Sequence, residues 1–167
     1  AQAEVVGSPE GPMLVIAGPG TGKTLTMVRR IAYLLTTGLP PQTIAAVTFT
    51  NRAAREMRER LIALLGPGAQ QPFVGTFHVM GLQILTRFYG GEISVITRER
   101  QIELLQTLSG GTQRRAKERA AAISKARSML LPPANDVLPI YEAYRAELRA
   151  HNWFDFDDLI DEPLHLL

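Results

Sequence analysis

Residues 17–24 read Ala17-Gly18-Pro19-Gly20-Thr21-Gly22-Lys23-Thr24 and lie between an apolar run and a helical pattern. The apolar run predicts a strand over about Met13–Ala17. The residues that follow predict a helix that begins near Gly22, runs to about Thr37 and stops at Gly38. A strand, a glycine-rich turn and a helix in this order form the arrangement that holds a nucleoside triphosphate.

The chemistry of this stretch follows from its residue types. Its three glycines, at positions 18, 20 and 22, let backbone N–H groups approach phosphate oxygens. The positive end of the following helix faces the same oxygens. Lys23 can reach the β- and γ-phosphates, and the Thr24 hydroxyl is suited to bind Mg²⁺. The first residue is Ala17 rather than glycine, so the match is to the relaxed motif. The alternative is a glycine-rich turn with a chance Gly-Lys-Thr.

Composition limits the class of protein. The 167 residues are 46% hydrophobic, which is typical of a globular chain with a core. The absence of cysteine excludes disulfides and thiolate metal sites. No apolar run reaches the length of about 18 residues that a membrane helix needs. The net charge of +2 does not by itself indicate nucleic acid, and the start at Ala1 suggests a trimmed chain.

Two further strand–helix pairs follow the first. We expect strands over Ile44–Phe49 and Phe73–Thr76 and helices over Arg52–Leu65 and His78–Tyr89, with Asn51 as the N-cap of the first helix. The repetition predicts a parallel α/β sheet with right-handed crossovers. A short helical turn over residues 1–6 and a loop over residues 7–12 precede the first strand.

After Gly90 the pattern becomes helical. A short extended segment over Glu92–Ile96 leads into four predicted helices, over 98–108, 113–130, 137–150 and 156–162. We therefore expect two domains, residues 1–90 and residues 91–167, the first α/β and the second all-helical.

Charge is unevenly distributed over the second domain. One predicted helix concentrates basic residues, which are Arg114, Arg115, Lys117, Arg119, Lys125 and Arg127. Such a helix beside a nucleotide site suggests a surface for a phosphate backbone, and a merely solvated face is an equally good interpretation. The acidic residues gather in the last helix, over 155–162.

Three more stretches, taken with the loop and in this order, carry a family resemblance. They are Thr48-Phe49-Thr50-Asn51-Arg52-Ala53-Ala54, Gly75-Thr76-Phe77-His78 and Asp155-Phe156-Asp157-Asp158-Leu159. Together they resemble the N-terminal motifs of the UvrD/Rep/PcrA family of superfamily-one DNA helicases. The resemblance covers nearly the whole chain. It implies a P-loop NTPase fold with part of a RecA-like parallel sheet, followed by a helical insertion domain.

The resemblance implies ATP and Mg²⁺ as cofactors, with Lys23 and Thr24 catalytic and Thr24 on the metal. Gln2 resembles the glutamine that reads adenine, which an amide can do with two hydrogen bonds. The implied nucleotide-binding residues are Gln2, Ala17, Gly18, Pro19, Gly20, Thr21, Gly22, Lys23, Thr24 and Leu25. Leu25 stands where many relatives have an arginine, and Arg30 is a weaker candidate for contact with the base.

The family also implies a path for single-stranded DNA. Its residues here are Thr48, Phe49, Thr50, Asn51, Arg52, Thr76, Phe77, His78 and Phe156. Aromatic rings can stack on bases, and hydroxyl, amide and guanidinium groups can bind phosphates. The alternatives are a core position for Phe49 and a structural hydrogen bond for His78. For the aromatic residues 153–156, the alternative is a helix-docking cluster in which Asp155 is an N-cap.

The run Leu159-Ile160-Asp161-Glu162 resembles the acidic end of a Walker B strand, but its helical context argues against that interpretation. The sequence therefore predicts a fragment of an ATP-dependent DNA helicase, inactive alone. Its expected partners are single-stranded DNA or a duplex junction and the remaining helicase domains, with no membrane, in the cytoplasm. The alternatives are a non-catalytic DNA- or nucleotide-binding module, a small-molecule kinase and a protein-interaction fragment.

Overall fold

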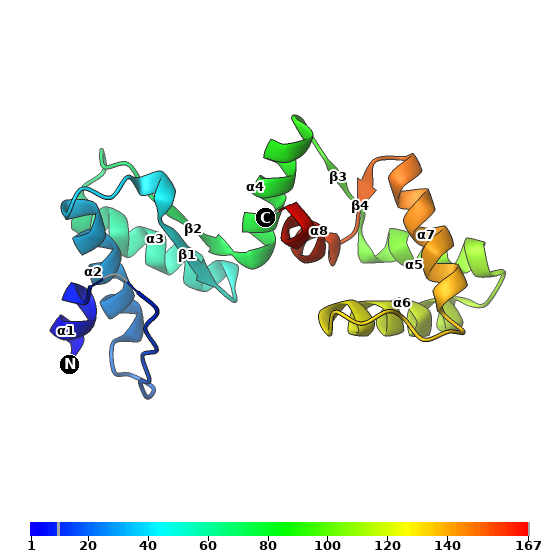
Figure 1. Cartoon of the computed structure of the whole chain (residues 1–167), viewed down its shortest axis with the longest axis horizontal. Coiled ribbons are helices and arrows are strands. Elements are labelled where there is room, and N and C mark those ends of the chain that lie inside the picture. Colours follow the sequence, from blue (N-terminus) through cyan, green and yellow to red (C-terminus); the bar gives the residue numbers. More distant parts are fainter. Residues whose placement is uncertain (10, 167) are drawn as a thin grey trace. The chain divides into compact units, whose positions relative to one another are not determined.

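The computed structural model describes residues 1–9 and 11–166 and divides into two compact units, residues 1–76 and 77–167 (Figure 1). Glu10, in the loop expected over residues 7–12, and Leu167, the last residue of the expected second domain, lie outside the described residues. The boundary between the units lies just before helix α4 (Phe77–Tyr89), one helix earlier than Gly90. Helix α4 belongs to the second unit because it packs on the last helix of the chain. The division into domains at Gly90 stays a prediction.

The first unit is a small α/β layer. Its elements are α1 (Gln2–Gly7), α2 (Lys23–Thr36), the 3₁₀ turn η1 (Pro41–Thr43), β1 (Ala45–Thr48), α3 (Asn51–Leu65) and β2 (Phe73–Thr76). Strands β1 and β2 are parallel and pair in register from Ala45 opposite Phe73 to Thr48 opposite Thr76. Helix α3 connects them, as the predicted crossover requires.

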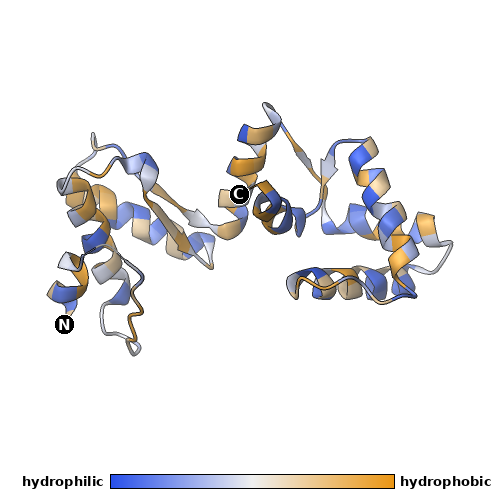
Figure 2. Cartoon of the chain, viewed as in Figure 1, coloured by the Kyte–Doolittle hydropathy of each residue, from blue (hydrophilic) through white to orange (hydrophobic). Residues whose placement is uncertain are grey.

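The core of this unit joins α2, the two strands and α3. Its buried members are Val28, Ile31, Ile44, Ala46, Ala54, Met57, Leu61 and Val74. On α3 these residues recur at spacings of three and four, so the helix is banded in both hydropathy colours in Figure 2. The core packs α2 against the strands and α3.

Two predictions for this unit were wrong. Residues 13–17 form no strand, and Leu14 and Ile16 are 87% and 90% exposed. The apolar pattern reports how readily a segment can be buried, but a strand also needs a neighbour, and the described sheet pairs only β1 with β2. The N-cap of α3 is Thr50 rather than Asn51, because the Thr50 hydroxyl accepts the N–H of Ala53 at 3.1 Å.

The second unit is mainly helical. It contains α4, β3 (Ser94–Val95), α5 (Arg98–Ser109), α6 (Gln113–Ser128), α7 (Leu138–Ala150), β4 (Trp153–Phe154) and α8 (Asp158–Leu166). The all-helical prediction was wrong in one respect, since β3 and β4 form a short parallel pair. The pair brings together two segments almost sixty residues apart, which no local pattern marks. The extended segment expected over 92–96 is confirmed at β3.

Two apolar clusters stabilise this unit. Helices α5, α6 and α7 share one, whose buried members are Leu104, Leu105, Ala116, Ala120, Ile123, Val137, Tyr144 and Leu148. The other joins Leu85 of α4 to Phe154 and Leu159 beside and within α8. Helix α8 continues through Pro163 to Leu166, beyond the end predicted at residue 162. Among the described helices, none has both the length and the apolar character to cross a membrane.

Candidate functional site

The loop before α2 is a tight turn closed by its own side chains. Gly20 and Gly22 take left-handed backbone angles, with φ of 74° and 85°, which glycine adopts without strain. The Thr21 hydroxyl donates to the carbonyl of Gly18 at 2.8 Å. Helix α2 begins at Lys23, directly after Gly22. The turn therefore ends where the positive end of a 14-residue helix begins.

Lys23 folds its side chain back over this turn. Its ammonium donates to the carbonyls of Ala17 and Gly18 at 3.1 and 2.6 Å, and both groups are neutral acceptors. A phosphate oxygen forms a stronger, charge-assisted bond with an ammonium than a carbonyl does. The side chain is exposed, so an anion can replace these carbonyls. Thr24, in the first turn of α2, is half-buried.

Gln2 reaches the loop from α1. Its side-chain amide donates to the carbonyl of Thr21 at 2.7 Å. A Cβ atom on Gly22 would lie 3.1 Å from the same nitrogen, so Gly22 also makes room for Gln2. Arg30 of α2 donates to the carbonyls of Val6 and Ser8 at 2.8 and 2.6 Å. Arg30 therefore anchors α1, while Pro19 and Leu25 are exposed at the loop.

Five of the predicted DNA residues, positions 48–52, follow or end β1. The Phe49 side chain is 96% exposed, which contradicts a core position for this ring. The Thr48 hydroxyl donates to the carbonyl of Thr50 at 3.0 Å, and Asn51 opens α3. Arg52 pairs with Glu56 at 3.1 Å on an exposed face. Thr76 lies opposite Thr48 at the carboxyl end of the sheet, where parallel sheets bind ligands.

The second unit brings two predicted DNA residues into contact. The ring of His78, in α4, stacks on the ring of Phe156, with centroids 4.0 Å apart and planes inclined by 19°. Phe156 keeps 59% of its surface exposed, and Phe77 keeps 50%. We call the two stacked rings of His78 and Phe156 the His78–Phe156 stack. His78 thus packs against an aromatic ring that itself remains open to a ligand.

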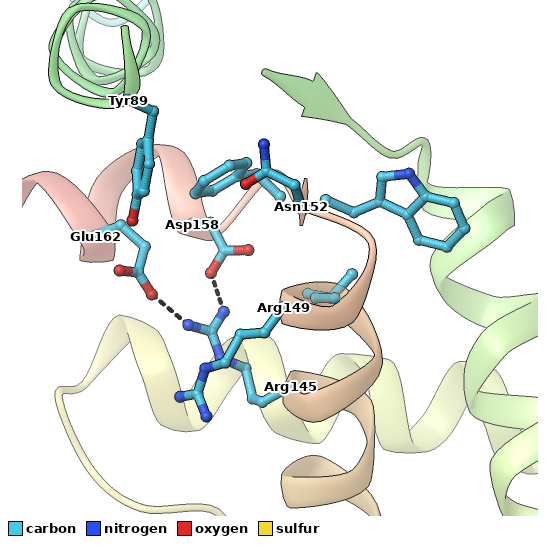
Figure 3. Close-up of a pocket in the computed structure, with 9 residues that line it drawn as sticks. Tyr89, Arg145, Arg149, Asn152, Asp158 and Glu162 are labelled. Atoms are coloured by element: carbon cyan, nitrogen blue, oxygen red, sulfur yellow. Dashed lines mark hydrogen bonds and ion pairs between the residues drawn. The ribbon is translucent and has the colours of Figure 1, made fainter. Parts of the chain in front are cut away.

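An ionic network that the sequence analysis missed lies behind this stack. Arg127 is 7% exposed and binds three carboxylates: Asp155 through two contacts of 3.0 Å, Asp158 at 2.7 Å and Asp161 at 2.5 Å. Arg145 of α7 binds Asp158 and Glu162 (Figure 3). The Asp155 and Asp158 side chains each accept the other's backbone N–H, at 2.9 and 2.8 Å.

Burial and the neighbouring charges shift the pKa values of three groups in the network. Burial alone lowers the pKa of Arg127, but Asp155 and Asp158 outweigh it and raise the pKa above its ordinary value. Burial and the Asp155 carboxylate raise the pKa of Tyr144, whose hydroxyl donates to Asp155 at 2.9 Å. Burial and Asp155 also raise the pKa of Asp158, against the opposite effects of Arg145 and Arg127.

The network corrects the expected basic surface and bears on two other interpretations of the sequence. Arg127 points into the protein, so it is not part of an exposed basic face, whereas Arg115, Lys117 and Lys125 are exposed. The Asp155 carboxylate accepts the Asp158 N–H at the start of α8, as expected of a cap, whereas the exposed ring of Phe156 does not fit a helix-docking cluster. Asp161 and Glu162 lie in α8 and bind arginines, so rejecting a Walker B strand there is confirmed.

Two cavities flank the network. One, of about 290 Å³, is lined by Tyr89, Arg149, Asn152 and both ends of the Arg145 ion pairs, as Figure 3 shows. The other, of about 410 Å³, lies on the side of Phe156 and Asp157. Among the described residues there is no cluster of three or more His, Asp or Glu side chains able to hold a metal. Thr24 can supply one hydroxyl ligand for Mg²⁺, and a triphosphate supplies others.

Fold and loop together define a mixed α/β chain with short parallel strand pairs and a glycine-rich turn that opens a helix. The whole chain, residues 1–167, matches the UvrD/REP helicase N-terminal domain, and it belongs to that family.

Full-length relatives agree with this assignment. The chain is 35% identical over 192 residues to the ATP-dependent DNA helicase UvrD1 of Mycobacterium tuberculosis, covering 99% of the chain and 25% of the relative. Identity to the ATP-dependent DNA helicase PcrA of Bacillus subtilis is 35% over 191 residues, with the same coverage. Identity to PcrA of Leuconostoc citreum is 37% over 184 residues, covering 95% and 24%. The chain thus spans about a quarter of the length of these relatives.

Proposed function

We propose that the chain is the nucleotide-binding part of an ATP-dependent DNA helicase. In this proposal the turn over residues 17–24 holds the phosphates of ATP, and Lys23 binds the β- and γ-phosphates. Thr24 contributes to the Mg²⁺ site, and Gln2 lies beside the base. The observation that carries the proposal is the Lys23 ammonium, which lies over the turn on two neutral carbonyls at the N-terminus of α2.

Single-stranded DNA is the proposed second ligand, and each unit contributes its own contacts. In the first unit the open ring of Phe49 and the polar groups of Thr48, Thr50, Asn51 and Arg52 follow β1. Base–aromatic stacking contributes about 1–3 kcal/mol per base. In the second unit the His78–Phe156 stack offers an aromatic face, with Phe77 next to it in the chain.

The parent protein, in this proposal, couples hydrolysis of ATP to movement along DNA and to strand separation. The chain's own residues bind and orient ligands. The carboxylates of Asp155, Asp158, Asp161 and Glu162 are held by arginines and are unsuited to activate water. We therefore expect the isolated chain to bind nucleotide and DNA but to hydrolyse ATP at a negligible rate.

Titration of the isolated chain with a fluorescent ATP analogue, with and without Mg²⁺, tests the nucleotide site. Lys23→Ala should weaken binding by about tenfold or more, since it removes a charge-assisted contact. Lys117→Ala is the matched control, because Lys117 is also an exposed lysine but lies on α6 of the second unit. Equal affinities for the wild type and Lys23→Ala, in the presence of Mg²⁺, would overturn the proposed site.

A non-catalytic DNA-binding module is the second candidate for the isolated chain, and the exposed basic residues of α6 favour it. Binding to phosphates releases counterions, so affinity should fall steeply as salt rises. Charge reversal at Arg115 and Lys117 should flatten that dependence, while reversal at Arg29 of α2, also exposed, serves as the control. A salt-independent affinity, or no affinity, for a single-stranded oligonucleotide would count against this candidate.

A further inference from the structure

Phe156 stands between residues that are firmly held, although its own ring is open. Asp155 and Asp158 are 2% and 1% exposed, and Asp157 accepts the Ser124 hydroxyl at 3.0 Å. Side chains of α5, α6 and α7 bind these three carboxylates. The backbone on both sides of Phe156 is thereby fixed, and the aromatic ring is the part of the segment that projects outward.

Arg127 is the centre of this arrangement. All three of its nitrogens are used, with Nη1 on both oxygens of Asp155, Nη2 on Asp158 and Nε on Asp161. The contacts lie before and after Phe156 in the chain, so one rigid guanidinium plane sets the spacing of both flanks. A lysine has a single charged nitrogen and cannot reproduce that geometry.

Two uncharged side chains also bind Asp155. The buried hydroxyl of Tyr144 and the amide of Gln101 donate to Asp155 Oδ2 at 2.9 and 3.2 Å. Gln101 itself accepts from Arg98. Helices α5, α6 and α7 therefore all contact the carboxylate directly before Phe156.

We propose that Arg127 and Tyr144 are positioning residues for single-stranded DNA binding: they hold Phe156 against His78 in the orientation that receives a base. The inference rests on the proposed function and deepens its second-unit DNA surface. Neither residue touches the DNA in this proposal. Both act by fixing the backbone torsion angles of residues 155–158. Little conformational freedom of the Phe156 side chain is then lost when a base stacks on it.

Stability alone does not account for such a network. Replacing a buried ion pair by apolar groups of similar volume is often neutral or stabilising, so buried ion pairs contribute little net stability. Their geometric effect is stronger, because every hydrogen bond in the network has a fixed direction. The network binds the residues on both sides of Phe156, whose ring is exposed, so its fixed geometry can orient that ring.

Nuclear magnetic resonance of the His78 ring tests the positioning directly, without DNA. The ring current of Phe156 shifts the His78 ring signals, and Phe156→Ala gives the unstacked reference. Tyr144→Phe and Arg127→Lys should move the His78 signals towards that reference. Tyr141→Phe is the matched control, since Tyr141 packs against the same cluster one turn earlier in α7. Trp153 fluorescence in urea identifies variants that stay folded, and Tyr144→Phe carries the test if Arg127→Lys unfolds.

Binding of an oligo-dT strand then tests the coupling to DNA. Phe156→Ala should weaken binding by about 5- to 150-fold, and Tyr144→Phe by about 2- to 5-fold. In the Phe156→Ala background Tyr144→Phe should have no further effect. The same loss in both backgrounds, or unchanged His78 signals in a folded Arg127→Lys or Tyr144→Phe variant, would overturn the inference. If Phe156→Ala binds DNA like the wild type, the proposed DNA surface fails, while the His78 signals still decide the positioning.

Discussion

Gly81 of α4 lies where a side chain of any size is excluded. A Cβ atom placed on Gly81 would be 1.7 Å from the carbonyl oxygen of Leu159 and 3.3 Å from Cγ of Pro163, both in α8. Pro163 has no N–H, so the carbonyl of Leu159, four residues earlier, lacks its usual helical partner. Glycine lets α4 approach that carbonyl closely. The substitution Gly81→Ala should therefore separate the two helices.

The magnitude follows from these distances. The Leu159 oxygen must move away by about 1.3 Å to reach even the shortest contact that Cβ atoms make. It belongs to a helix backbone and cannot rotate aside. Overpacking of this kind costs about 1–3 kcal/mol or more, and the better helix propensity of alanine returns about 1 kcal/mol. A clash with a helix backbone lies at the upper end of that range, so we expect a net loss of about 2 kcal/mol in the free energy of unfolding of the second unit.

Urea unfolding followed by tryptophan fluorescence measures this loss, because Trp153 is the chain's single tryptophan and packs in the second unit. Gly91→Ala is the control, since a Cβ atom there meets nothing within 4 Å. The His78 ring signals should shift as well, because α4 carries His78 one turn before Gly81. A Gly81→Ala variant as stable as the Gly91→Ala variant would refute the reasoning.

Three more predictions concern the ionic network and the cap of α3. Arg127→Met should cost about 3–5 kcal/mol in urea unfolding, because it leaves buried carboxylates without a partner, whereas Arg114→Ala, which breaks an exposed ion pair, should leave the midpoint unchanged. Tyr144 should ionise last in an alkaline titration followed at 295 nm. Because the pKa of Tyr144 is raised in the folded state, its contribution to the free energy of unfolding is present at and below the ordinary pKa of tyrosine and is lost as the pH rises above it. A smaller absorbance change for Tyr144→Phe than for the wild type in the ordinary tyrosine range would contradict this. Thr50→Ala should destabilise the first unit by about 1 kcal/mol, measured by thermal melting in circular dichroism, while Thr43→Ala, whose hydroxyl caps only an exposed turn, should have a smaller effect.

Local signals made the loop and the crossover predictable. Glycines at fixed offsets gave the turn that ends at Lys23, and apolar spacing gave α3 to within one residue. The strand expected over Met13–Ala17 failed because its apolar pattern says nothing about which strand would pair with it. Short-range spacing predicts a helix because its hydrogen bonds are local, whereas a strand depends on residues elsewhere in the chain.

The ionic network was unpredictable for the same reason. Arg127 looked like one more basic residue of a surface helix, and its three carboxylate partners lie 28 to 34 residues further on. One signal was present, since residue 127 continues the buried row of Ala116, Ala120 and Ile123 on α6. An arginine on the apolar face of a helix needs a buried acid, and the acidic segment over 155–162 was the source available.

The exposed rings of Phe49 and Phe156 are therefore different kinds of surface. Phe49 is 96% exposed and follows a strand end, and no described ring is stacked on it. It must lose most of its side-chain freedom when a base stacks on it, which reduces the net gain. Phe156 has already lost that freedom, because its neighbours are bound by Arg127 and its ring rests on His78. For equal contact with a base, we therefore expect Phe156 to bind the base more tightly than Phe49, because the network orders the segment around Phe156 before DNA binds.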